Sequence, residues 1–176
     1  GHEGRSERGV REWEIGMRTT VLIAGVAMLA SPANALTYFE RLVLQELSCG
    51  SPPSPTLLIR ELADAGMINL ADNIGFDSLS CYQIKGELVV KGVALTSICV
   101  YEEDPLIQSW NEDIYYRAPG TSPGQTLAFG TPLDANKLSD WYLDQFGPAN
   151  VASAIAEGEM TLLGSESEVS CRGYMQ

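Results

Sequence analysis

Histidine is almost missing from this sequence of 176 residues. The single histidine is His2, which lies in a polar stretch without apolar periodicity. Ser-His-Asp triads, Cys-His pairs and His-ligated catalytic zinc sites all depend on an imidazole. None of these sites can therefore be built from the rest of the chain.

Lysine is scarce, and the common nucleotide-binding motifs are missing. The lysines are Lys85, Lys91 and Lys137, and although a Ser-Lys dyad is formally allowed, nothing marks one serine as its partner. The sequence contains neither GxGxxG nor GxxxxGKS/T, the glycine-rich patterns that place backbone N–H groups around phosphates. We therefore assign no catalytic residue and expect no cofactor.

Positive charge is outweighed by negative charge. The chain has 11 Lys+Arg against 23 Asp+Glu, which gives a formal net charge of −12. Such a balance repels phosphate backbones and anionic lipid surfaces. We therefore expect no nucleic-acid partner, and the charge instead favours solubility or a cationic partner.

The segment before residue 36 has the layout of a secretory signal peptide. Residues 17–20 are short and positively charged, Val21 to Ala30 are apolar, and Ala33-Asn34-Ala35 matches the A-x-A cleavage pattern. A transmembrane helix needs roughly 20 apolar residues, and this run has half of that. We expect cleavage after Ala35, which leaves no integral membrane segment.

This prediction divides the chain into three regions. Residues 17–35 are the signal peptide, and residues 1–16 are an upstream extension or residues added for expression. Residues 36–176 are the mature protein, whose length suits one hydrophobic core and therefore a single domain. Because the signal sequence is of bacterial style, the expected location is the bacterial periplasm or the exterior.

Four cysteines lie in the predicted mature region. An even number of cysteines behind an export signal is typical of a disulfide framework, and the chain has no C-x-x-C pair that would indicate zinc. We therefore predict two disulfides and no metal site. The four residues allow three pairings, which the sequence does not distinguish: Cys49, Cys81, Cys99 and Cys171.

Three helices are predicted from apolar spacing and from their end signals. Residues 36–48 carry apolar side chains at helical intervals. Ser54 and Pro55 are typical of the N-cap and first position of a second helix. Asp134 is a suitable N-cap for a third helix that ends at Gly147.

Short β-rich runs follow and separate these helices. Lys91-Gly92 lies between two of them and predicts a tight hairpin turn. We therefore expect an α+β fold, in which helices pack on one face of a mainly antiparallel sheet that two disulfides staple. The predicted strands are residues 79–84, 87–90, 93–101, 114–117, 125–129, 158–163 and 167–175.

Two stretches share one skeleton. GELVVKGVALTSIC at 86–99 and GEMTLLGSESEVSC at 158–171 both place Gly-Glu, a second Gly and a Cys at the same intervals. Each is predicted to read strand, glycine turn, strand after a helix. This pattern favours a pair of helix–strand–strand units over a chance match or a ligand motif.

The candidate binding residues lie at the start of a long irregular stretch, residues 102–130. Stretches of this length without regular structure are often functional, and here carboxylates alternate with aromatic side chains. Tyr, Trp and Arg are enriched at binding hot spots. We therefore predict a binding surface at Tyr101, Glu102, Glu103, Asp104, Trp110, Glu112, Asp113, Tyr115, Tyr116 and Arg117.

The same residues fit other interpretations. Paired carboxylates beside aromatic rings are what a glycosidase needs. Carboxylate oxygens also bind calcium, although the spacing does not match an EF-hand loop, and an acidic loop can simply be solvated. We expect an exported, non-catalytic binding protein with a protein partner, and the alternative is a carboxylate-based hydrolase of carbohydrate or cell-wall material.

Overall fold

The structure, a computed structural model, describes most of the chain after residue 31. Most of the predicted signal peptide, Arg117 and all but the last residue of the predicted strand at 158–163 lie outside the described residues. The described residues are 32–76, 78–116, 124–148, 155–156 and 163–173.

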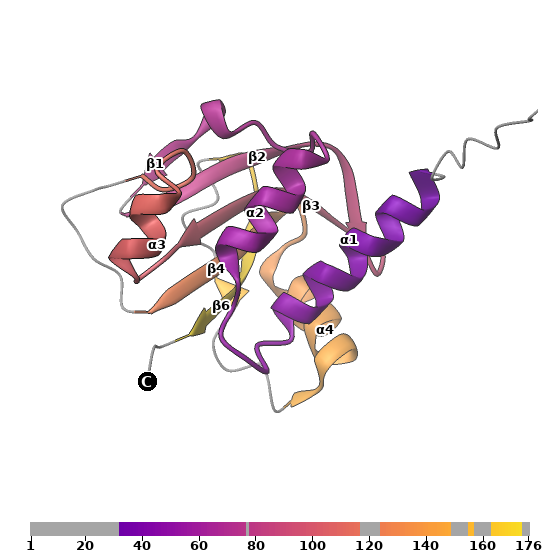
Figure 1. The fold of residues 1–176 in the computed structure, drawn as a ribbon. Helices are drawn as coiled ribbons and strands as arrows, with labels where there is room; N and C mark the ends of the chain where they lie inside the picture. Colours follow the sequence, from indigo (N-terminus) through magenta and orange to yellow (C-terminus); the bar gives the residue numbers. More distant parts are fainter. Residues whose placement is uncertain (1–31, 77, 117–123, 149–154, 157–162, 174–176) are drawn as a thin grey trace, which may run out of the picture.

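One antiparallel sheet organises the fold (Figure 1). Its strand order is β1-β2-β3-β4-β6-β5, and each neighbouring pair is antiparallel. The predicted α+β class and antiparallel sheet are therefore confirmed. The strands are β1 (Ile74–Phe76), β2 (Leu79–Val90), β3 (Val93–Tyr101), β4 (Gln125–Thr131), β5 (Ile155–Ala156) and β6 (Ser167–Gly173).

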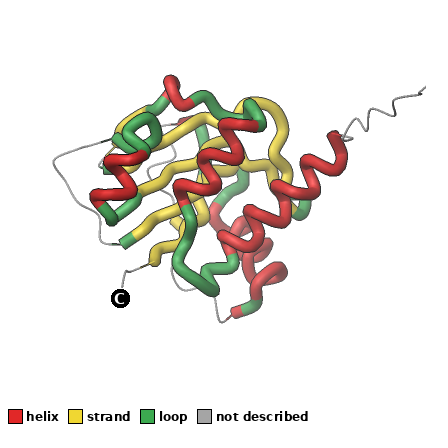
Figure 2. The backbone as a smooth tube through the Cα atoms, viewed as in Figure 1, coloured by secondary structure: helices red, strands yellow, loops and turns green. Residues whose placement is uncertain are grey.

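The main hydrophobic core lies between one face of this sheet and three helices (Figure 2). A cross-strand row of Tyr82, Ile98, Phe129 and Val169 is fully buried there. The helices contribute apolar side chains to the same cluster, as alternation in strands and 3.6-residue periodicity in helices require. These three helices are α1 (Pro32–Leu47), α2 (Pro55–Asp64) and α4 (Ala135–Phe146), whereas the six-residue α3 (Pro105–Trp110) and the 3₁₀ turn η1 (Leu70–Asp72) have no buried residue.

Two disulfides lie on opposite faces of the sheet. Cys81 and Cys99 face each other across β2 and β3, with their Cα atoms 4.1 Å apart. Cys171 of β6 points to the helical face and is bonded to Cys49, which follows α1. The prediction of two disulfides is therefore confirmed, and such bonds are compatible with an oxidising compartment.

The two stretches with a common skeleton have cysteines with different partners, because Cys99 is bonded to Cys81 and Cys171 to Cys49. The first stretch forms the β2–β3 hairpin, whereas residues 158–162 of the second lie outside the described residues. The helix–strand–strand repeat therefore stays a prediction.

The predicted hairpin turn is confirmed at Lys91-Gly92. Both residues have positive φ, 47° and 81°, as a two-residue hairpin turn of the primed type requires. The predicted strands 79–84 and 87–90 are two parts of β2, separated by a register shift between Gln83 and Leu88.

The predicted strand at 114–117 is wrong in its described part. The backbone N–H groups of Ile114 and Tyr115 both donate to the carbonyl of Asn111, at 2.9 and 3.2 Å, so the chain turns there instead of pairing with the sheet. Ile114 and Tyr115 are buried, which explains why their composition resembles that of a strand.

The start of α1 differs from its prediction, whereas α2 starts as predicted but without the expected capping bond. Helix α1 begins at Pro32, four residues before Leu36, and proline is favoured in a first helical turn. Ser54 occupies the N-cap of α2, but its side chain makes no capping bond. Its backbone N–H instead donates to Oε2 of Glu46 at 2.7 Å, so Glu46 of α1 fixes the start of α2.

In the described part of the chain, no helix is long and apolar enough to span a membrane.

Candidate functional site

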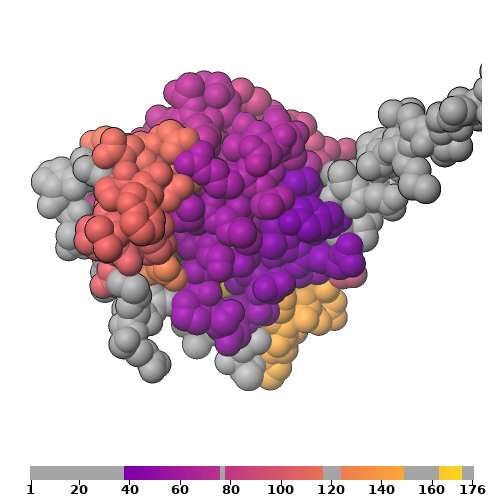
Figure 3. Space-filling model, viewed as in Figure 1, coloured from indigo at the N-terminus to yellow at the C-terminus, as the bar shows by residue number. Residues whose placement is uncertain are grey.

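A pocket of about 550 Å³ opens between the start of α2 and α3. Its walls are the turn at residues 52–55, the first two turns of α2, Ile107 of α3, Glu102 directly after β3 and Gln125 at the start of β4. This volume is in the range of known ligand pockets. Figure 3 shows α3 and the residues after it at the surface beside α2.

Prolines shape one wall of this pocket. Pro52, Pro53 and Pro55 surround Ser54, and each proline fixes φ near −65°. Pro53 and Pro55 are buried, while the N–H of Ser54 is tied to Glu46 of α1. The turn is therefore rigid, and it leads directly into α2.

Glu102 is the buried acidic group of the pocket, with only 2% of its surface exposed. Its two carboxylate oxygens accept hydrogen bonds from Nε2 of Gln125 at 3.0 and 3.1 Å. Its Oε1 also accepts from the backbone N–H of Asp104 at 3.1 Å. These donors are neutral, and no Lys or Arg of the described residues forms an ion pair with Glu102.

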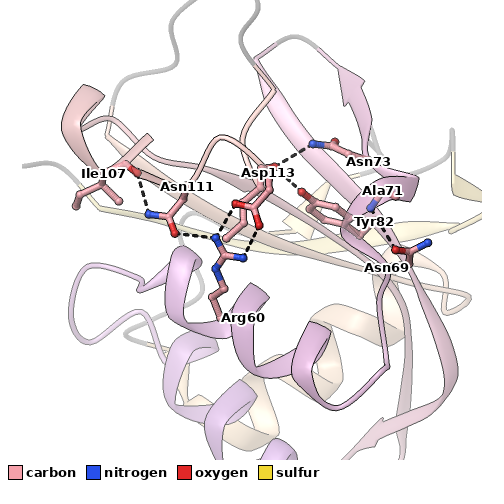
Figure 4. Close-up of polar contacts among 9 residues, drawn as sticks. Arg60, Asn69, Ala71, Asn73, Tyr82, Ile107, Asn111 and Asp113 are labelled. Carbon is pink, nitrogen blue, oxygen red and sulfur yellow. Dashed lines mark hydrogen bonds and ion pairs between the residues drawn. The ribbon is translucent and has the colours of Figure 1, made fainter. Parts of the chain in front are cut away.

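Arg60 of α2 lines the same pocket, but its guanidinium is directed at the segment after α3 (Figure 4). Nη1 and Nη2 donate to the two carboxylate oxygens of Asp113 at 2.5 and 2.6 Å, and Nη2 also donates to Asn111 at 3.0 Å. The hydrogen bond from Arg60 lowers the pKa of Asp113 below its usual range. The same bond raises the pKa of Arg60.

Two buried tyrosines fix the segment after α3. The hydroxyl of Tyr115 is 2.6 Å from Oγ1 of Thr56 on α2, and the hydroxyl of Tyr82 donates to the carbonyl of Ile114. Burial raises the pKa of both tyrosines well above the usual value. Both hydroxyls therefore stay protonated and keep these bonds at physiological pH.

Large apolar side chains are exposed beside the pocket. Trp110 and Leu106, four residues apart on α3, are 76% and 61% exposed, and Leu57 of α2, which lines the pocket, is 52% exposed. Residues four apart share one face of a helix. Exposed apolar clusters of this kind are typical of interaction sites.

The ten residues predicted from the sequence divide into several groups. Glu102 lines the pocket, Asp113 and Tyr115 bind the segment after α3 to α2, and Trp110 lies exposed on α3. Of the predicted residues that the structure describes, only Glu102 lines the pocket, so the binding surface stays a prediction.

Other predicted residues have structural positions. Tyr101 is buried in the small cluster on the opposite face of the sheet, and Asp104 caps α3 by accepting from the N–H groups of Leu106 and Ile107. The ring of Tyr116 lies over Gly75 of β1. Glu103 is half-buried, Glu112 is exposed and Arg117 lies outside the described residues.

Sequence reasoning missed Arg60, Glu61, Gln125 and the proline turn. The signal that could have indicated the turn is the run Pro52-Pro53-Ser54-Pro55, which we interpreted only as a helix boundary. Of the five predicted acidic residues, all of which are described, only Glu102 lines the pocket. Glu61 is the other carboxylate of the pocket lining. Within the described residues, no group of three or more His, Cys, Asp or Glu side chains could hold a metal ion.

Comparison with known proteins gives no relative. No protein-family model, no curated protein and no solved structure matches this chain. Function must therefore be argued from the pocket and its surroundings.

Proposed function

We propose that this chain is an exported, non-catalytic binding protein that recognises a protein partner through the surface around the pocket. The observation that carries the proposal is the exposure of Trp110 and Leu106 on α3, the helix whose Ile107 lines a preformed pocket. Tryptophan in such a position is a typical binding hot spot. The Arg60–Asp113 and Thr56–Tyr115 contacts hold α2, one wall of the pocket, to the segment after α3, which reduces the ordering cost of binding.

The predicted signal peptide and the two disulfides support export to the bacterial periplasm or exterior. The hydrolase alternative has weaker support. A glycosidase needs two carboxylates that flank the substrate; the pocket lining has Glu102 and Glu61, but both oxygens of Glu102 already accept hydrogen bonds from Gln125. The buried position of Glu102 and its amide partners suit recognition of a ligand group.

The test is capture of a partner from the exported fraction of the source cells with immobilised protein. Leu106→Ala and Trp110→Ala should lose a partner that the parent protein retains. Leu143→Ala is the matched control, because Leu143 is an exposed leucine (38%) on α4. A partner retained equally by all four proteins contradicts the proposal.

A further inference from the structure

Among the described residues, no positively charged side chain pairs with the buried carboxylate of Glu102 in the pocket. Glu102 is 98% removed from solvent, and its described hydrogen-bond donors are one side-chain amide and one backbone N–H. An ionised carboxylate loses several kcal/mol of hydration free energy on burial, and a well-placed cation can offset this loss. The chemistry that completes this site is therefore a cationic group.

Arg60 does not supply that cation. Arg60 lines the pocket, but its guanidinium meets both oxygens of Asp113 and the amide oxygen of Asn111 (Figure 4). The Arg60–Asp113 pair is neutral as a unit. The remaining charges of the pocket lining are Glu102 and the half-buried Glu61, both negative.

The apolar walls suit the stem of a long cationic side chain. Pro53, Leu57 and Ile107 supply aliphatic surface to the pocket that Glu102 also lines. Lysine and arginine bury their methylene stems along apolar surface while the charged end meets a polar group. The exposed Leu106 and Trp110 beside the pocket offer apolar contacts for the neighbouring residues of the same segment.

We infer that the pocket binds a lysine or arginine side chain of an extended segment of the protein partner, with the cationic end on the Glu102 carboxylate. This inference rests on the proposed function and names the chemistry of the partner. The net charge of −12 favours approach of a basic segment, because complementary charge steers association.

Short peptides test the inference without knowledge of the partner. The probes are acetylated and amidated pentapeptides Ala-Leu-Xaa-Leu-Ala in which Xaa is lysine, arginine or norleucine, the neutral analogue of the lysine stem. The disulfide-bonded protein is titrated by NMR, and the Gln125 side-chain amide and the methyl groups of Leu57 and Ile107 report on the pocket. We expect the lysine and arginine peptides to bind at least tenfold more tightly than the norleucine peptide.

Two variants that each remove one negative charge from the pocket test whether the preference for lysine depends on Glu102. Glu102→Gln should reduce the preference for lysine over norleucine to less than twofold and leave the norleucine peptide unaffected. Glu61→Gln removes the same net charge from a more exposed position, where the carboxylate shares a hydrogen bond with Tyr38, and should keep at least half of the preference. Thermal melts of both variants confirm that each is folded.

Several results would overturn the inference. They are equal binding of norleucine and lysine peptides, an unchanged preference in Glu102→Gln, no peptide binding, or butylammonium binding as tightly as the lysine peptide. If all peptides bind equally and all weaken in Trp110→Ala, the inference fails and the proposed function stands. If no peptide binds and Trp110→Ala also captures partners normally, both fail.

Discussion

Arg60 and Asp113 form a two-pronged ion pair, in which each outer nitrogen of the guanidinium meets one carboxylate oxygen, at 2.5 and 2.6 Å. Arg60 lies on α2, which lines the pocket, and Asp113 lies three residues after α3, so the pair joins α2 to the segment after α3. Planar pairs of this kind fix geometry as well as charge. Loss of the Arg60–Asp113 pair should therefore affect both the pH dependence of folding stability and the affinity for a ligand.

The acid dependence of stability should reveal this pair. Arg60 holds the pKa of Asp113 below its unfolded value. The stabilisation of the folded state by this pair is therefore present above about pH 4, the unfolded pKa, and is lost as the pH falls through the lower folded pKa. Both side chains are more than a third exposed, so Asp113→Asn should lower the free energy of unfolding by only about 0.5 kcal/mol at pH 7.

Urea unfolding at a series of pH values checks this prediction. The difference between the parent protein and Asp113→Asn should shrink toward zero near pH 2. Asp72→Asn is a comparison variant. Lys85 also lowers the pKa of Asp72, but neither residue of this ion pair lines the pocket. A difference that grows as the pH falls would contradict the assigned direction of the Asp113 shift.

Glu102→Gln should not destabilise the ligand-free protein. The substitution removes a buried charge and preserves a similar shape, and an amide oxygen can still accept from Gln125 and from the N–H of Asp104. We expect a free energy of unfolding equal to or up to about 1 kcal/mol above that of the parent. Calorimetry that shows a loss above 1 kcal/mol would indicate that the charge is already compensated within the chain.

The two disulfides should contribute unequally. The Cys49–Cys171 bond closes a separation of 122 residues, and the Cys81–Cys99 bond closes one of 18. Chain-entropy arguments give about 5 and about 3 kcal/mol for loops of these sizes. Urea unfolding of Cys49→Ala/Cys171→Ala should therefore show a loss about 2 kcal/mol larger than that of Cys81→Ala/Cys99→Ala, and equal losses would reject this explanation.

Gly130→Ala should destabilise the sheet. A Cβ at this position would overlap the hydroxyl oxygens of Ser97 and Ser165, which are both buried. Overpacking a buried site costs about 1–3 kcal/mol. The double variant Gly130→Ala/Ser165→Gly makes room on one side and should recover part of the loss, as measured by thermal unfolding; no recovery would place the strain elsewhere.

The fold class could be predicted because its signals are local. Strand β3 has the predicted bounds, the Lys91-Gly92 turn is where positive φ is needed, and Asp134 caps α4 by accepting from Lys137. Each feature depends on a few neighbouring residues. Helix α3 was missed because its six residues are too few to show a period, although Asp104-Pro105 is a helix-start signal.

The pocket could be predicted only in part, because it depends on contacts between distant segments. Glu102 and Trp110 were singled out by residue type alone. Arg60 and Asp113 are 53 residues apart, and Glu102 and Gln125 are 23 apart, so no spacing in the sequence indicates that they meet. One disulfide pairing likewise follows from the β2–β3 register, which the sequence does not specify.

The Cys49–Cys171 bond makes a covalent ring that contains the whole sheet except the last two residues of β6. Tension applied beyond these two cysteines passes through the sulfur atoms, so it can peel away α1 but cannot extend the chain inside the ring. A protease cut at one peptide bond within the ring likewise leaves a single covalently linked molecule. The pocket, whose lining residues all lie between 49 and 171, is therefore kept in one piece under mechanical load and after a single cleavage.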